Sequence, residues 1–459
     1  MIAPMSETSR TFPDGFTWGA AAASYQIEGA ARDDGKGLSV WDMMCRQPGK
    51  IEGGDAGESA CDHYRRYRED VELMAEIGLQ AYRFSVSWPR VLPEGAGRVN
   101  EAGLAFYDRL VDALLEHGIE PWLTLFHWDY PYELFLRGGW LNQDSPKWFA
   151  EYAEVVVERL SDRVRHWIPQ NEPQCFIHLG HLDGVHAPGL KLGIEEVLLA
   201  AHHSLLAHGM AVQAIRAGAK SPPVVGGAPV GFPKIPHTGA PEDIEAARTA
   251  MFSMDAPGFW NNAWFGDAMV FGRYPEDGVA MFGEAMPEIR EGDMETIGQP
   301  LDFFGVNIYF GDRVRAGADG RPETVPPEAG APRTTMGWVA EPESLYWGPR
   351  LLHERYQLPI VITENGMANT DWVQSDGRVQ DPQRIDFLAR YLREYRRAIA
   401  DGVEAKGYFL WSILDNFEWS YGYAKRFGIV HVDYATGKRT PKDSAAWYRE
   451  VIRSNGEKI

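Results

Sequence analysis

Short apolar runs rich in β-branched and aromatic residues recur along the chain, and amphipathic stretches lie between them. A run that is apolar at nearly every position is typical of a strand buried on both faces. Strands of this kind that alternate with helical patterns predict a parallel sheet. Eight runs fit the description, at residues 16–22, 81–86, 121–126, 164–169, 224–228, 303–308, 360–363 and 407–412.

Helical periodicity is clearest in five of the intervening stretches, at residues 64–77, 102–117, 146–160, 194–217 and 381–400. Eight strand and helix alternations predict an α/β fold, a single (β/α)8 TIM barrel. The most loop-like region, 313–333, lies between the sixth and seventh predicted strands rather than between domains. We therefore expect a flexible N-terminus over residues 1–10 and one barrel domain over residues 11–459.

Composition excludes several classes of protein. A net charge of −20 argues against nucleic-acid partners, which bind clustered Lys and Arg, so neutral small molecules fit better. Residues 1–10 lack a signal-peptide core, and no stretch offers the roughly 20 apolar residues that cross a bilayer. We expect a soluble cytoplasmic protein with no membrane partner. Cys45, Cys61 and Cys175 have no zinc spacing, which predicts reduced, mostly buried thiols and no metal site.

Polar and aromatic residues gather at or shortly after the predicted strand ends, where such barrels hold their active sites. The set holds two well-placed carboxylates, Glu172 and Glu364, among amides, an imidazole and aromatic rings, without a phosphate-binding Gly loop. This set suits glycoside hydrolysis, which needs one acid to protonate the leaving oxygen and a second carboxylate facing the anomeric carbon. Structural roles such as strand capping or ion pairing are the alternative for each residue alone. The candidates are Gln26, Glu28, Arg83, His127, Trp128, Asn171, Glu172, Asn307, Tyr309, Glu364, Asn365 and Trp411.

Two local sequences, Asn171-Glu172-Pro173 and Thr363-Glu364-Asn365-Gly366, resemble the catalytic motifs of glycoside hydrolase family 1. A single Asn-Glu-Pro would be weak, but further motifs that resemble the family follow one another in the right order. They are Phe12-Pro13-Asp14-Gly15-Phe16, Gln26-Ile27-Glu28-Gly29-Ala30, Arg83-Phe84-Ser85-Val86-Ser87-Trp88, His127-Trp128-Asp129, His186-Ala187-Pro188-Gly189 and Asp415-Asn416-Phe417-Glu418-Trp419.

The resemblance implies a retaining mechanism, with Glu364 as nucleophile and Glu172 as acid and then base. It places Arg83, Asn307 and Tyr309 beside them, where Arg83 and Tyr309 would favour the ionised nucleophile. The charge of Glu364 would raise the pKa of Glu172 in the free enzyme. Retention further predicts carboxyl groups about 5 to 5.5 Å apart, and it needs no cofactor or metal.

The resemblance also implies a set of substrate-binding residues. They include the ligands of the sugar hydroxyls, the platform beneath the ring and the aromatic residues at the entrance. A cis peptide bond after the platform Trp411 is a further family feature and predicts one between Trp411 and Ser412. The expected substrate-binding residues are Gln26, His127, Trp128, Asn171, Trp338, Trp411, Glu418, Trp419 and Phe427.

Substrate choice rests on the end of the last motif. Glu418 can bind the 4- and 6-hydroxyls of a sugar but would repel a 6-phosphate, and Phe427 stands where phospho-glycosidases place Tyr. We expect a β-glucosidase that also accepts β-galactosides and β-fucosides. A phospho-glycosidase, an inverting hydrolase and a catalytically inactive sugar-binding barrel remain the alternatives. Gln174 stands where many members have Trp, so the leaving-group preference stays open.

Overall fold

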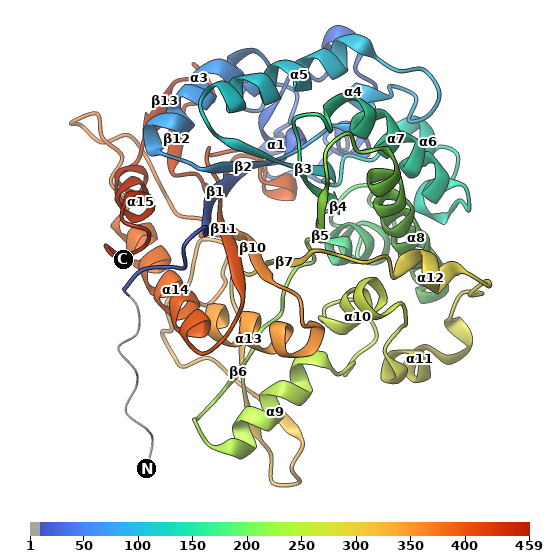
Figure 1. Cartoon of the computed structure of the whole chain (residues 1–459), viewed down its shortest axis with the longest axis vertical. Coiled ribbons are helices and arrows are strands. Elements are labelled where there is room, and N and C mark those ends of the chain that lie inside the picture. Colours follow the sequence, from blue (N-terminus) through green and yellow to red (C-terminus); the bar gives the residue numbers. More distant parts are fainter. Residues whose placement is uncertain (1–9) are drawn as a thin grey trace.

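The computed structural model describes residues 10–459, and eight of its strands close into a parallel barrel at the centre of the molecule (Figure 1). Around the barrel the strands follow the order β1-β11-β10-β7-β5-β4-β3-β2, so the first strand closes against the last. This confirms the predicted TIM barrel. The strands are β1 (Thr17–Ala21), β2 (Ala81–Ser85), β3 (Glu120–Phe126), β4 (His166–Gln170), β5 (Val224–Gly227), β7 (Phe303–Asn307), β10 (Ile360–Asn365) and β11 (Ala405–Trp411).

Helices surround the barrel and cover the outer faces of its strands (Figure 1). The five stretches with helical periodicity are helices α3, α5, α7, α8 and α14, whose apolar sides are buried. The longer helices are α3 (His63–Ile77), α5 (Glu101–Glu116), α7 (Ser145–Leu160), α8 (Ile194–Gly218), α9 (Pro241–Phe252), α10 (Ala263–Phe271), α13 (Ser344–Tyr356), α14 (Pro382–Ala400) and α15 (Asp443–Arg453). Shorter ones are α1 (Ser24–Ile27), α2 (Val40–Met44), α4 (Trp88–Val91), α6 (Tyr132–Phe135), α11 (Glu276–Phe282) and α12 (Asp293–Ile297).

The region 313–333 is more ordered than the sequence predicts. It holds β8 (Asp312–Ala316) and β9 (Pro322–Val325), which form a small sheet with β6 (Lys234–Pro236). Of the five residues of β8 only Val314 is buried, so the strand lacks the continuous apolar run by which the barrel strands were recognised. A two-stranded sheet of β12 (Val430–Val432) and β13 (Arg439–Pro441) completes the strands.

The flexible N-terminus expected over residues 1–10 lies outside the described residues except for Arg10, whose carbonyl oxygen accepts a hydrogen bond from Arg396.

Directly after β10, a Cβ atom on Gly366 would lie 1.8 Å from the carbonyl oxygen of Trp411, so only glycine lets these two strand ends meet. Among residues 10–459, no helix combines the length and apolar character that a membrane crossing requires.

Candidate active site

A cavity of about 490 Å³ opens at the carboxyl ends of the barrel strands. Five of the candidate residues, Gln26, Glu28, Arg83, Asn307 and Asn365, do not line it. Gln26, Arg83 and Asn307 contact side chains of its wall, whereas Glu28 accepts hydrogen bonds from Arg90 and Tyr107 and Asn365 accepts one from Tyr408. The cavity wall brings together the other eleven, which are His127, Trp128, Asn171, Glu172, Tyr309, Trp338, Glu364, Trp411, Glu418, Trp419 and Phe427.

Glu364, at the end of β10, is held between a guanidinium group and a phenol. Arg83 Nη1 donates to its Oε1 at 2.7 Å, and the Tyr309 hydroxyl donates to its Oε2 at 2.6 Å. Burial raises the pKa of Glu364, whereas Arg83 and then Tyr309 oppose that rise by stabilising the charged form. Both carboxylate oxygens therefore have a donor, which fixes the orientation of the side chain.

Glu172 follows β4 in a left-handed backbone conformation with φ of 45°. Its backbone N–H donates to the carbonyl oxygen of Ala228 at 2.8 Å, which holds this uncommon geometry against the end of β5. The side chain accepts from neutral donors: Asn307 Nδ2 at 2.8 Å on Oε1 and Cys175 Sγ at 3.0 Å on Oε2. Burial, and then the charge of Glu364, raises the pKa of Glu172 to about 7. The two carboxyl groups thus have clearly different surroundings.

The amide of Asn171 is linked to Glu364 through Arg83, to Glu172 through Asn307, and directly to the imidazole of His127. Its Oδ1 accepts from Arg83 Nη2 at 2.6 Å and from Asn307 Nδ2 at 3.0 Å, so the other end of the amide must be the donor. That Nδ2 lies 3.1 Å from His127 Nε2. Burial and the charge of Arg83 lower the pKa of His127, so the ring is neutral and accepts this hydrogen bond at Nε2.

Gln26 and Glu418 meet at the other side of the cavity. Gln26 Nε2 donates to Asn416 Oδ1 at 3.0 Å and to the carbonyl oxygen of Phe417 at 2.9 Å, and it lies 3.3 Å from Glu418 Oε2. Burial, and then the charges of Glu364 and Glu172, raise the pKa of Glu418 to about 8. This favours the protonated form of Glu418, which can donate as well as accept hydrogen bonds.

Aromatic rings form much of the remaining wall. Trp411 is followed by a cis peptide bond to Ser412, as predicted. The Trp128 and Trp419 rings pack at 4.5 Å between centroids, and both residues have a positive φ. Since Trp128 Nε1 donates to the carbonyl oxygen of Asn171 at 2.9 Å, this indole presents a ring face rather than a free N–H group.

Comparisons with known proteins agree with this geometry. Residues 8–457 match the protein family described as "Glycosyl hydrolase family 1". The chain belongs to glycosyl hydrolase family 1. "Beta-glucosidase A" of Thermotoga maritima is 46% identical to this chain over 97% of its length and 99% of the relative's. A solved β-glucosidase structure from Thermotoga maritima in complex with glucoimidazole has a TM-score of 0.89 at 45% identity, covering 97% of this chain and all of that one.

A further relative is the aryl-phospho-beta-D-glucosidase BglC of Bacillus subtilis, which is 40% identical over 98% of both chains. Relatives of both substrate classes are thus similar to this chain over almost its whole length. The chain is a glycoside hydrolase of the β-glucosidase kind. Because its relatives include both classes, its preference for free or phosphorylated sugars has to be inferred from its own cavity residues.

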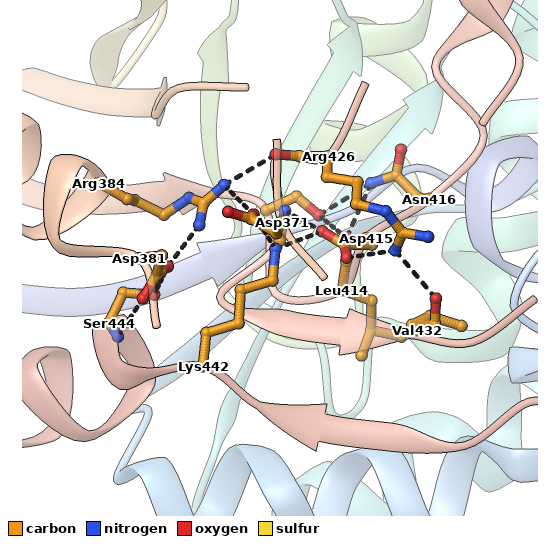
Figure 2. Close-up of polar contacts among 12 residues, drawn as sticks. Asp371, Asp381, Arg384, Leu414, Asp415, Asn416, Arg426, Val432, Lys442 and Ser444 are labelled. Carbon is orange, nitrogen blue, oxygen red and sulfur yellow. Dashed lines mark hydrogen bonds and ion pairs between the residues drawn. The ribbon is translucent and has the colours of Figure 1, made fainter. Parts of the chain in front are cut away.

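Asp415, three residues before Glu418, belongs to a network of charged side chains in this family 1 enzyme (Figure 2). Lys442 Nζ donates to Asp371 at 2.5 Å and to Asp415 at 2.7 Å. Arg384 also donates to Asp371, at 2.6 Å, and Arg426 donates to Asp415 at 2.7 Å. With Asp381 bound to Arg384, three carboxylates face three cations. The network fixes Asp415, next to the Asn416 that holds Gln26.

Some cavity residues of this family 1 enzyme were not predicted from the sequence. Cys175 contacts Glu172, although the sequence predicts only a buried thiol. Phe232 and Trp260 also line the cavity but come from irregular segments without periodicity, where no sequence signal points to them. Gln174, by contrast, is turned away and exchanges hydrogen bonds with the backbone of Val230.

The described part of the chain, residues 10–459, contains no group of three or more His, Cys, Asp or Glu side chains that could hold a metal ion. Its three cysteines are unpaired thiols, with Cys61 and Cys175 buried and Cys45 half-buried. Of the three carboxyl groups that line the cavity, Glu364 lies beside a guanidinium group and Glu172 beside neutral donors.

Proposed function

We propose that this family 1 enzyme is a retaining, exo-acting β-glucosidase. It releases terminal non-reducing β-D-glucosyl residues from oligosaccharides and from aryl or alkyl glycosides. The observation that carries the proposal is the unequal pair of carboxyl groups. Arg83 and Tyr309 donate to Glu364 and favour its ionised form, whereas Glu172, with only neutral donors and a pKa of about 7, keeps a proton.

In the first step Glu364 attacks the anomeric carbon and forms a covalent glycosyl-enzyme. The glycosidic oxygen takes the proton of Glu172 as its bond to the sugar breaks, and the alcohol departs. Arg83 keeps Glu364 oriented for attack. The Tyr309 hydroxyl donates to Oε2, which we assign as the carboxylate oxygen that does not bond to the sugar.

In the second step Glu172, now ionised, removes a proton from water while the oxygen of that water attacks the anomeric carbon. The bond to Glu364 breaks, and its electron pair returns to the carboxylate. Once Glu364 carries the sugar, its charge no longer raises the pKa of Glu172, so the same group changes from acid to base. Two displacements at one carbon give a β-product from a β-substrate.

Glycone recognition is assigned to the polar residues around the carboxyl groups. Asn171 binds the 2-hydroxyl, a contact that strengthens in the transition state, while His127, Glu418 and Trp419 bind the other hydroxyls. Gln26 lies behind Glu418, and its Oε1, which has no partner in the described structure, is assigned to the same set. The flat face of Trp411 packs on the apolar face of the ring. Trp338, whose ring centroid lies 6.2 Å from that of Phe427, forms the entrance on the leaving-group side.

Three side chains support a preference for free over phosphorylated sugars. Glu418 offers a carboxyl group where a phosphate would need cations. Phe427 has no hydroxyl group, and Lys425 donates to the carbonyl oxygen of Thr335 at 2.8 Å instead of facing the cavity wall. β-Galactosides and β-fucosides remain proposed side substrates. Galactose differs from glucose in the orientation of the 4-hydroxyl, and fucose in addition lacks the 6-hydroxyl, so only one or two hydroxyl contacts change in a shared site.

The sequence predictions on organisation and location also stay proposals. We propose one catalytic barrel domain over residues 11–459, without cofactor or nucleic-acid partner. A cytoplasmic location is supported by unpaired Cys45, Cys61 and Cys175, since disulfides are typical of oxidising compartments.

Initial rates on matched p-nitrophenyl glycosides test the proposal. The panel holds β-glucoside, β-galactoside, β-fucoside and 6-phospho-β-glucoside, with the parent enzyme and Glu364→Ala in parallel. We expect turnover of the β-glucoside that collapses in the variant, and proton NMR should detect β-glucose first. Preference for the phosphorylated glycoside would refute the substrate assignment, and α-glucose as first product would refute retention.

A further inference from the structure

A thiol lies in the cavity wall against the proposed acid/base residue. Cys175 Sγ is 3.0 Å from Glu172 Oε2, and Cys175 itself lines the cavity. The contact is local, because Cys175 stands three residues after Glu172 and its backbone N–H donates to the Glu172 carbonyl oxygen at 2.9 Å. A π-helix, Cys175–Leu182, begins at this residue and holds it in place.

The thiol acts on Glu172 as a neutral donor. Burial, and then the charge of Glu172, raises the pKa of Cys175 well above its ordinary value, so the group is S–H rather than thiolate. Asn307 donates to Oε1 and Cys175 to Oε2, so each oxygen of the Glu172 carboxyl group has one neutral donor. The charged or titratable side chains whose fields reach Glu172 are Glu364, Arg83, Tyr309 and Glu418.

We propose that Cys175 is a positioning residue for Glu172, whose S–H group fixes the orientation of the carboxyl group and favours the ionised form that the second step requires. The inference rests on the proposed function, because it takes Glu172 to be the acid/base. Burial and Glu364 both favour the protonated form of Glu172, and a donor on Oε2 opposes them. Without it Glu172 would hold its proton more tightly.

This predicts a displaced pH profile. A donor that stabilises the carboxylate lowers its pKa, so removal of the donor raises the pKa of Glu172. The alkaline limb of kcat/KM, where the acid loses its proton, then moves to higher pH by about half a pH unit or more. A residue that only filled space would change rates or stability without moving this limb.

The test compares four proteins across the pH range on one aryl β-glucoside: the parent, Cys175→Val, Cys175→Ser and Cys45→Ala. Valine keeps the volume but has no donor, serine keeps a donor, and Cys45 is a thiol outside the cavity wall. We expect the alkaline limb of kcat/KM to move to higher pH in Cys175→Val. In Cys175→Ser and Cys45→Ala it should stay within about 0.2 pH units of the parent. A Cys175→Val profile that superimposes on the parent overturns the inference.

Two further arms keep the result interpretable. Glu172→Ala, assayed with an activated aryl glucoside and azide, should lose the alkaline limb, because the limb belongs to Glu172. If the limb persists there, the proposed role of Glu172 fails. If it disappears while Cys175→Val matches the parent, only the role of Cys175 fails. Far-UV circular dichroism checks folding, and Cys175→Ala takes the same measurement should Cys175→Val not fold.

Discussion

Replacing Lys442 by methionine tests whether the buried charge network stabilises the enzyme. The Lys442 side chain is fully buried, and its ammonium group is shared by Asp371 and Asp415. Methionine keeps the length and most of the apolar stem but removes the charge. The variant leaves Asp371, Asp381 and Asp415 with only two guanidinium groups, those of Arg384 and Arg426 (Figure 2).

The expected loss follows from the burial of both partners. Removal of one member of a buried ion pair leaves an uncompensated charge and costs about 3–5 kcal/mol in the free energy of unfolding. Burial alone would raise the pKa of Asp371, but Arg384 and Lys442 bring it below its ordinary value. This depressed pKa stabilises the fold above the unfolded pKa, and the contribution is lost as the pH falls through the folded value. The difference between variant and parent should therefore be largest at neutral pH and narrow in acid.

Urea unfolding, followed by tryptophan fluorescence and far-UV circular dichroism at pH 7 and in acid, measures this difference. Lys442→Met with Asp371→Asn is the matched control, since it restores two carboxylates against two guanidinium groups. We expect the double variant to recover about 1–3 kcal/mol of the loss. A single variant that costs less than about 1 kcal/mol at neutral pH, or a loss that does not depend on pH, would refute the reasoning.

Three shorter predictions concern activity. Tyr309→Phe removes one donor to the charged Glu364, so kcat/KM should fall about 10- to 100-fold, and an unchanged value would contradict that role. With burial and then Glu364 raising the pKa of Glu172 to about 7, kcat/KM should fall as the pH rises through about 7; a limb displaced by about two pH units would contradict the assignment. Glu418→Gln should reduce kcat/KM more for the β-glucoside than for the β-fucoside, which lacks the 6-hydroxyl, and equal losses would refute that contact.

The barrel could be predicted because its strands are buried on both faces and so form continuous apolar runs. The run at 360–363 identified β10, although the strand continues to Asn365 and includes Glu364. Strands β8 and β9 could not be found in this way, because they are short and half-exposed. The pairing of β8 with β6 joins segments about 80 residues apart, which local periodicity does not reveal.

The two carboxyl groups could be located from the sequence because their motifs follow predicted strands. Their surroundings could only partly be predicted. The sequence offers Trp128 as a substrate ligand, but its N–H group is bound to the Asn171 backbone, a contact that depends on a positive φ at Trp128. The contact of Cys175 with Glu172 depends on the turn that follows β4, and Trp260 reaches the cavity from a distant irregular segment.

Trapping the covalent intermediate tests the central claim most directly. An activated 2-deoxy-2-fluoro-β-glucoside slows both steps, because fluorine disfavours the oxocarbenium-like transition states, while its good leaving group keeps the first step the faster. Mass spectrometry of the inactivated, digested enzyme should find one fluoroglucosyl group, on the peptide that contains Glu364 and on that side chain. A label on another carboxylate, or turnover without any covalent adduct, would contradict the proposed double displacement.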